Sequence, residues 1–246
     1  MKNNLYNTII DNLKTIFYAL LIALVIRSFF FQPFYIPSSS MEPTLLIGDR
    51  IFVSKYSYGY SKHSMPFSPP IYNQRIFNVD PSRGDLVVFK TPTDNRTDFI
   101  KRIIGLPGDL VQFKEGEIFL NNKALLRKKT KEIFNIKCGD LDKEVNTYKE
   151  TLPSGLTYIT AYHKLGSFLN SDVYKVPINH YFLLGDNRDC SSDSRYLNRV
   201  GYVPKINLVG KAQLIFFSND TTVSGVLEFW NLGKSFRLKR SLKKLK

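Results

Sequence analysis

The feature that most constrains this chain is a long apolar segment near its start. Residues 15–31 read TIFYALLIALVIRSFFF, in which Arg27 is the only charged residue. At about 1.5 Å per residue, a helix of this length nearly crosses the roughly 30 Å hydrocarbon core of a bilayer. Arg27 stands near one end, from which its side chain can reach the headgroups. The segment predicts one membrane anchor over residues 14–32, after a short tail of residues 1–13 and before a separate folded body.

A cleaved signal peptide is the alternative interpretation of this segment, because Lys2 and Lys14 precede it and small residues follow it. Its apolar run is longer than a usual signal-peptide core, and residues 29–34 are bulky where a processing site would be small. We therefore favour an uncleaved anchor. Lys2 and Lys14 precede the anchor, and the first positive residue after it is Arg50. This bias favours a cytoplasmic N-terminus.

The positive charge of the chain is concentrated at its C-terminus. The 246 residues carry a net charge of +14, and residues 233–246 contribute seven Lys and Arg without any acid. We find no zinc spacing, ribonucleoprotein box or helix-turn-helix pattern, so we expect anionic lipid and not nucleic acid as the partner. Leu238, Leu242 and Leu245 recur at helical spacing, which fits a helix lying on a membrane or, equally, a solvated tail.

Cysteine and histidine are sparse in this chain. Cys138 and Cys190 are too few for a disulfide framework, and we expect two free thiols. His63, His163 and His180 are scattered without metal-ligand spacing. We therefore expect neither a metal site nor a cofactor.

Short runs of β-branched and aromatic residues follow the anchor, separated by Gly, Pro, Asn and Asp, and they predict a mostly β body. Asn121-Asn122 predicts a hairpin turn. We divide the body into a core of residues 33–115 plus 181–232, an inserted β subdomain of residues 116–180, and the basic tail. The predicted strands are 50–53, 85–89, 99–104, 110–113, 117–120, 181–184 and 213–217.

Three motifs point to nucleophilic chemistry. PSSSMEPTL begins at Pro37, FIKRIIGLPGD begins at Phe99, and GDNRDCSSDSR begins at Gly185. A serine hydroxyl needs a base to become a nucleophile, and no histidine stands in a serine-protease context here. In this strand-like sequence Lys101 shares a face with the apolar Phe99 and Ile103, and burial lowers the pKa of a lysine from about 10.4. Lys101 is therefore the predicted base.

These motifs, with RGDLVVF at residues 83–89, resemble the conserved boxes of bacterial type I signal peptidases, which are membrane-bound Ser–Lys enzymes that remove signal peptides from exported preproteins. The resemblance covers the anchor and most of residues 33–115 and 181–217. It implies Ser40 as nucleophile and Lys101 as general base. Ser38 and the backbone N–H of Ser40 would stabilise the oxyanion, and Ser191 would orient the lysine amine.

The resemblance also implies an outer ring of site residues and a substrate preference. Asp186, Arg188, Asp193 and Arg195 would brace the site. Ile36, Pro37, Met41, Leu45 and Ile100 would line shallow pockets that accept an Ala-x-Ala sequence before the cut. The implied partners are signal-peptide-bearing preproteins and membrane lipid, without nucleic acid or metal. The implied location is the bacterial inner membrane, with one membrane pass and the body on the outer, periplasmic side.

Two alternatives remain open. One is a Ser–Lys relative with narrower substrates, such as a conjugation-pilin maturation peptidase or an organelle inner-membrane processing peptidase. The other is a β-rich binding protein with an inactive site, against which the presence of Ser40, Lys101 and Ser191 argues. Ser39 stands where many relatives have Gly, and Cys190 stands where they have a polar residue. For Phe216-Phe217 we favour ordinary core over a place in the membrane interface.

Overall fold

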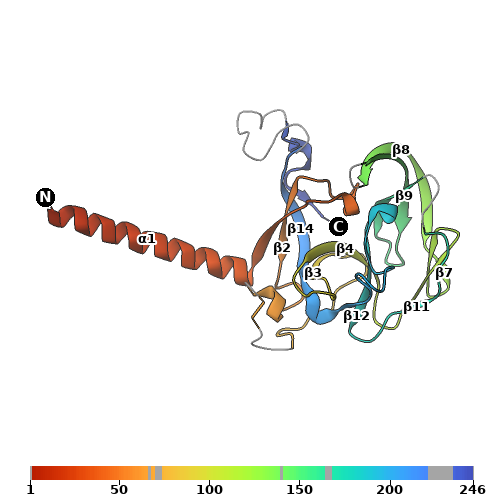
Figure 1. Cartoon of the computed structure of the whole chain (residues 1–246), viewed down its shortest axis with the longest axis horizontal. Helices are drawn as coiled ribbons and strands as arrows, with labels where there is room; N and C mark the ends of the chain where they lie inside the picture. Colours follow the sequence, from red (N-terminus) through yellow and green to blue (C-terminus); the bar gives the residue numbers. More distant parts are fainter. Residues whose placement is uncertain are drawn as a thin grey trace.

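A long N-terminal helix projects from a β-sheet body (Figure 1). The structure is a computed structural model that describes residues 2–65, 68–69, 74–138, 141–163, 168–220 and 235–245. Helix α1 spans Lys2–Phe29, and its part Tyr6–Phe29 is long and apolar enough to cross a membrane. The helix differs from the prediction at both ends, because it begins at Lys2 and because residues 31–35 already form a strand. Pro33 cannot continue a helix, and it lies in an edge strand, where a missing N–H is tolerated.

The largest sheet is antiparallel throughout and contains most of the predicted strands. Its order is β1-β2-β14-β3-β4-β12-β13, and β15 also pairs with β14. The strands are β1 (Phe31–Tyr35), β2 (Asp49–Ser54), β3 (Leu86–Lys90), β4 (Asp98–Gly105), β12 (His180–Leu184), β13 (Val203–Pro204), β14 (Leu208–Ser218) and β15 (Lys243–Lys244).

Two smaller sheets hold the remaining strands. One has the order β11-β5-β6-β7, with β5 (Leu110–Lys114), β6 (Glu117–Leu120), β7 (Lys123–Ala124) and β11 (Tyr174–Lys175). The other has the order β10-β9-β8, with β8 (Leu126–Cys138), β9 (Leu141–Thr151) and β10 (Thr157–His163). The predicted hairpin turn is confirmed, since Asn121 and Asn122 have φ of 51° and 65° between β6 and β7.

Short 3-10 helices connect the strands. Among the described residues they are η1 (Ser39–Met41), η2 (Lys62–Ser64), η3 (Arg188–Cys190), η4 (Lys205–Asn207) and η6 (Leu238–Arg240). The η1 turn is attached to the hydrophobic core, because Met41 and Leu45 are fully buried in an apolar cluster with residues of β2, β3 and β14. Burying each such side chain contributes roughly 1.5–3 kcal/mol. The serine-rich motif therefore has a rigid apolar base.

The C-terminal segment packs onto the body over its described residues, 235–245, so it is neither the helix nor the free solvated tail, while a place at the membrane surface stays a prediction. Lys243–Lys244 form β15 against β14, and Leu245 packs against the apolar cluster beneath η1. Arg240 Nη2 lies 2.6 Å from Asp49 Oδ2 and 3.0 Å from the carbonyl oxygen of Thr44. Of the three leucines, Leu238 lies in η6 and Leu242 and Leu245 flank β15, so they do not form one helical face.

The expectation of ordinary core for Phe216-Phe217 is also wrong, because both rings are half-buried. Phe216 stacks on Phe52 at 4.2 Å between centroids, and Phe217 stacks on Phe236 at 5.2 Å. Phe216 also lines a surface depression with Pro33, Phe34, Tyr35 and Arg50. These rings belong to the surface beside β1, the strand that follows helix α1.

Candidate active site

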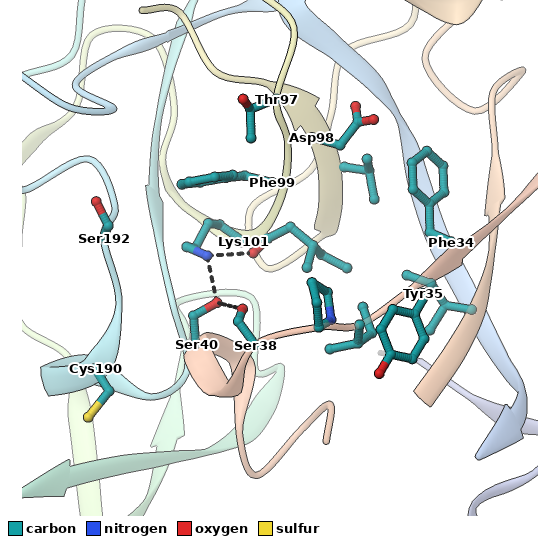
Figure 2. Close-up of a pocket in the computed structure, with 15 residues that line it drawn as sticks. Phe34, Tyr35, Ser38, Ser40, Thr97, Asp98, Phe99, Lys101, Cys190 and Ser192 are labelled. Atoms are coloured by element: carbon teal, nitrogen blue, oxygen red, sulfur yellow. Dashed lines mark hydrogen bonds between the residues drawn. The ribbon is translucent and has the colours of Figure 1, made fainter. Parts of the chain in front are cut away.

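Ser40 and Lys101 meet in the structure although 61 residues separate them (Figure 2). Ser40 lies in η1, and Lys101 lies in β4, which supplies an inward-facing side chain at this position. The Lys101 amine is 2.8 Å from Ser40 Oγ. The two side chains are 3% and 9% exposed, so the pair is largely withdrawn from water.

The environment of Lys101 favours the neutral amine. Burial lowers the pKa of Lys101 to about 8, while Asp193 and Asp186 act in the opposite direction and Arg195 adds to the decrease. The amine also donates to the carbonyl oxygen of Ile100 at 2.9 Å. A substantial neutral fraction near pH 8 gives this side chain the capacity to act as a base.

The two other predicted serines lie beside the pair. Ser38 Oγ is 3.4 Å from Ser40 Oγ. Ser191 is buried, but its hydroxyl has no hydrogen-bond partner among the described residues. The expected hydrogen bond from Ser191 to the lysine amine is thus not made in this structure.

Gly185 was missed as a site residue by the sequence analysis. A Cβ atom at Gly185 would lie 2.2 Å from Ser191 Oγ and 2.4 Å from the carbonyl oxygen of Ser40. Only hydrogen fits in that space. The glycine was visible as the first residue of the third motif, but nothing in the sequence shows that Ser40 and Ser191 approach it.

Asp186, in the motif that begins at Gly185, binds Arg102, in the motif that begins at Phe99. Arg102 is a second residue that the sequence did not indicate as part of the site. Arg102 Nε and Nη2 donate to the two carboxylate oxygens of Asp186 at 2.9 and 2.8 Å, with both side chains fully buried. Thr44 donates to the same carboxylate at 2.6 Å. The neighbouring Asn187 donates its backbone N–H to the carbonyl oxygen of Ser40 at 3.2 Å. These bonds hold the Ser40 turn against β4.

The remaining predicted bracing residues form two further buried ion pairs. Arg195 Nε lies 2.8 Å from Asp193 Oδ1, and the other oxygen of Asp193 accepts from the backbone N–H of Gly185 at 3.0 Å. Arg188 Nη1 lies 2.7 Å from Glu150 Oε1, with side-chain exposures of 1% and 2%. Glu150 comes from β9, in the region predicted as an insert, and it was not predicted as a site residue.

An open cleft of about 460 Å³ lies along the Ser–Lys pair (Figure 2). Ile36, Pro37 and Ile100 line this cleft, and Phe34 and Phe99 add aromatic walls. Met41 and Leu45 do not line it, because they are fully buried in the cluster beneath η1. The cleft lining is mostly apolar, which suits a peptide with small apolar side chains.

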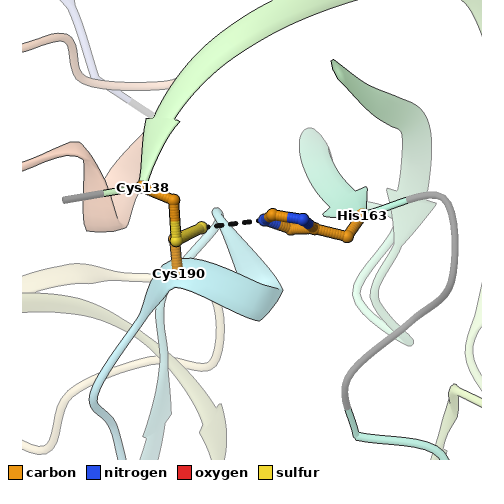
Figure 3. A group of neighbouring side chains, drawn as sticks. All are labelled: Cys138, His163 and Cys190. Atoms are coloured by element: carbon orange, nitrogen blue, oxygen red, sulfur yellow. Dashed lines mark hydrogen bonds between the residues drawn. A yellow bond between two sulfur atoms is a disulfide. The ribbon is translucent and has the colours of Figure 1, made fainter. Parts of the chain in front are cut away.

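Cys138 and Cys190 form a disulfide, so the expectation of two free thiols is wrong (Figure 3). The long strand β8 brings Cys138 to η3, with 5.4 Å between the two Cα atoms, a separation that a disulfide spans. His163 Nε2 lies 2.9 Å from Cys190 Sγ. The three potential donor atoms of Cys138, His163 and Cys190 lie within 4.8 Å of one another, a grouping that the scattered sequence positions did not indicate.

Comparison with known proteins gives consistent matches. The family described as "Signal peptidase, peptidase S26" matches residues 9–217. Signal peptidase I of Rickettsia canadensis is 40% identical over 232 residues, which cover 90% of this chain and 84% of that protein. Signal peptidase I of Rickettsia akari is 43% identical over 212 residues, covering 82% of this chain and 77% of that protein.

Among solved structures, a signal peptidase I from Enterococcus faecalis V583 is 25% identical, with a TM-score of 0.32, and the match covers 54% of this chain and 97% of that one. The family match spans most of the chain and includes the Ser40, Lys101 and Gly185 motifs. The chain therefore belongs to the peptidase S26 family of signal peptidases.

Proposed function

We propose that this chain is a membrane-bound signal peptidase I that cuts exported preproteins after an Ala-x-Ala sequence, with Ser40 as nucleophile and Lys101 as general base. The observation that carries the proposal is the 2.8 Å approach of the buried Lys101 amine to Ser40 Oγ beside an open apolar cleft. Burial that lowers the pKa of Lys101 to about 8 supports the role of base.

In the first step, the neutral amine of Lys101 accepts the proton of the Ser40 hydroxyl while Oγ attacks the scissile carbonyl carbon. The carbonyl oxygen becomes an oxyanion, which the Ser38 hydroxyl and the backbone N–H of Ser40 stabilise by donating hydrogen bonds. The closeness of Ser38 Oγ to Ser40 Oγ, 3.4 Å, supports this arrangement. The lysine ammonium then gives its proton to the leaving amine, and an acyl ester remains on Ser40.

In the second step, water attacks the ester. Lys101 accepts a proton from that water, the tetrahedral intermediate collapses, and the ammonium returns the proton to Ser40 Oγ. In this scheme Asp186, Arg188, Asp193 and Arg195 hold the reacting groups in place. The bonds from Arg102 to Asp186 and from Gly185 to Asp193 support their bracing role. Ser191 orients the lysine amine when substrate is bound.

The position of the site fits a substrate that lies in the membrane. Ser40 is eleven residues beyond Phe29, the last residue of α1. A signal peptide that spans the same bilayer presents its cleavage site at that level. Lys2 and Lys14 before the span support a cytoplasmic N-terminus, with the body on the outer side of a bacterial inner membrane.

The deciding experiment is cleavage of a preprotein with an Ala-x-Ala site by the full chain in detergent. Wild type, Ser40→Ala and Lys101→Met are compared with Ser39→Ala, an equivalent change in the same turn. We expect cleavage after the Ala-x-Ala sequence by wild type and Ser39→Ala, with loss of at least about 1,000-fold in the other two, the scale of losing a nucleophile or its base. Full activity of Lys101→Met would refute the mechanism. If the wild type is folded but cleaves no Ala-x-Ala substrate, the proposal of a general signal peptidase is refuted.

A further inference from the structure

A second cavity, of about 640 Å³, lies where helix α1 meets the body. Its volume falls in the range of about 300–1,000 Å³ that is usual for sites that bind small molecules. Leu24 and Arg27 of α1 line part of it, and the rest is lined by residues of β1, β14, η2 with the residues after it, and the hairpin of β3 and β4. The cavity is distinct from the Ser–Lys pair, although Phe34 and Asp98 line both cavities.

The lining of this cavity carries excess positive charge. Arg27, Lys90 and Arg96 bring three cationic groups, and Asp98 is the only acid among the described lining residues. Asp98 is paired with Lys90 at 2.9 Å. Within the described part of the chain, neither Arg27 nor Arg96 forms a salt bridge. The cavity therefore offers two cations without an acidic partner to an incoming anion.

The cavity is also lined by a buried histidine, one of whose ring nitrogens has no hydrogen-bond partner among the described residues. His63 is 5% exposed and lines the cavity, and its Nε2 has no hydrogen-bond partner among the described residues. Its Nδ1 lies 3.2 Å from Ser68 Oγ, which fixes the ring. Burial lowers the pKa of His63 to about 4, with Lys62, Lys90 and Arg75 adding to the decrease, so the ring is neutral. With the proton on Nε2, the ring can donate to an oxyanion; left unpaired, such a buried group costs about 1–3 kcal/mol.

The height of the cavity relative to a bilayer points to the source of the anion. Arg27 lies in the last turn of the membrane-spanning helix, where a cationic side chain reaches the headgroup layer. Leu24, one turn earlier, also lines the cavity, and with Arg27 at the headgroups it would lie at the border of the hydrocarbon layer. A ligand with a phosphate group above and acyl chains below fits this combination of cationic and apolar walls.

We propose that this cavity binds the phosphate-bearing headgroup of an anionic phospholipid, with Arg27 and Arg96 neutralising the phosphate and His63 donating a hydrogen bond to it. This site does not depend on the proposed peptidase chemistry. Because Phe34 and Asp98 also line the substrate cleft, a bound lipid lies next to the path of a membrane-embedded substrate.

The test is native mass spectrometry of the full chain in detergent, titrated with phosphatidylglycerol, phosphatidylcholine or inorganic phosphate. Arg27→Gln/Arg96→Gln removes two exposed cations of the cavity, and Lys123→Gln/Lys128→Gln removes two exposed cations elsewhere. His63→Leu removes the buried donor. Thermal unfolding shows which variants remain folded.

We expect wild type to retain at least tenfold more phosphatidylglycerol than phosphatidylcholine. The cavity double variant and His63→Leu should each lose at least fivefold of that binding, and the Lys123/Lys128 variant less than twofold. Equal losses in the two double variants, or equal retention of both lipids, would overturn the proposal. Inorganic phosphate that binds as tightly as the lipid would overturn the lipid as ligand. If the cavity double variant kept lipid but lost affinity for preproteins with acidic residues after the cleavage site, the cavity would belong to the substrate.

Discussion

Lys101 and Arg102 are adjacent in β4 and equally withdrawn from water, yet they meet opposite electrostatic conditions. The Lys101 amine faces Ser40, and burial lowers its pKa, since no carboxylate among the described residues bonds to it and Asp193 and Asp186 oppose the decrease only in part. Burial by itself would also lower the pKa of Arg102, but the bidentate contact with Asp186 outweighs this and raises it. Alternation along the strand therefore places a neutralisable base on one face and a permanent cation on the other.

The protonation of Lys101 predicts the pH dependence of cleavage. Only the neutral amine accepts a proton, so kcat/KM should rise with pH through a pKa of about 8 and level off above it. From pH 7 to pH 8 the neutral fraction grows about fivefold, and from pH 8 to pH 9 about twofold. The measurement is initial cleavage rate between pH 6 and 10, with Ser39→Ala as the matched control. A rate that is flat between pH 6 and 9 would exclude Lys101 as the base.

Gly185 predicts a site that tolerates no added methyl group. In Gly185→Ala, the new Cβ would collide with Ser191 and the backbone of Ser40, which should cost about 1–3 kcal/mol of unfolding free energy and at least about 100-fold in cleavage rate. Gly155→Ala is the control, because it has open space but a φ of +83°. It should lose about 1–2 kcal/mol of stability with cleavage unchanged. Equal cleavage by both folded variants would contradict this account.

At the scale of elements, strand β9 extends the site beyond the predicted core. Glu150 accepts from Arg188 and from the hydroxyls of Tyr158 and Tyr162, at 2.7, 3.0 and 2.8 Å. Arg188 in turn donates to the carbonyl oxygen of Gly185 at 3.1 Å. The sheet formed by β8, β9 and β10 therefore supports the third motif directly.

The Glu150–Arg188 pair predicts a large loss of stability when its charge is removed. In Glu150→Gln, Arg188 remains buried without its counter-charge, which should lower the unfolding free energy by about 3–5 kcal/mol. Glu117→Gln is the matched control, because its pair with Arg127 is partly solvated, with Glu117 45% exposed, and should contribute less than about 1 kcal/mol. Urea unfolding of the full chain measures both values. Similar losses in the two variants would show that burial does not set the strength of these pairs.

At the scale of the whole molecule, two distant segments close around the Ser40 turn. The disulfide joins the end of β8 to η3, immediately before Ser191. On the other side, Arg240 of the C-terminal segment binds the fully buried Asp49, which also accepts from the backbone N–H of Leu46 at 2.8 Å. The site is therefore held from the middle and from the end of the chain.

The disulfide predicts that stability depends on redox conditions. It closes a loop of 52 residues, for which loop entropy gives a stabilisation of roughly 4 kcal/mol. Reductant should therefore lower the unfolding free energy of wild type by about 2–4 kcal/mol. Urea unfolding with and without dithiothreitol measures this. The Cys138→Ala/Cys190→Ala variant should have the unfolding free energy of reduced wild type, and dithiothreitol should not change it. A wild-type midpoint that does not move would show that the thiols are not paired.

The sequence by itself determined the features that depend on local pattern. The N-terminal helix follows from an apolar run that only Arg27 interrupts, and strands such as β4 and β6 follow from short β-branched and aromatic runs between turn residues. Lys101 followed as the candidate base because a serine nucleophile without a suitable histidine needs another base, and Ser40 followed from the resemblance of its motif to the signal peptidase boxes.

Only the tertiary structure decided which distant residues meet. Cys138 meets Cys190 because β8 is long enough to reach η3, and Glu150 meets Arg188 because β9 packs beside the site. Met41 does not line the cleft because the apolar cluster beneath η1 buries it, and the C-terminal leucines do not form one helix because residues 243–244 pair with β14. Such contacts depend on how whole strands pair and pack, and no local pattern in the sequence records that pairing.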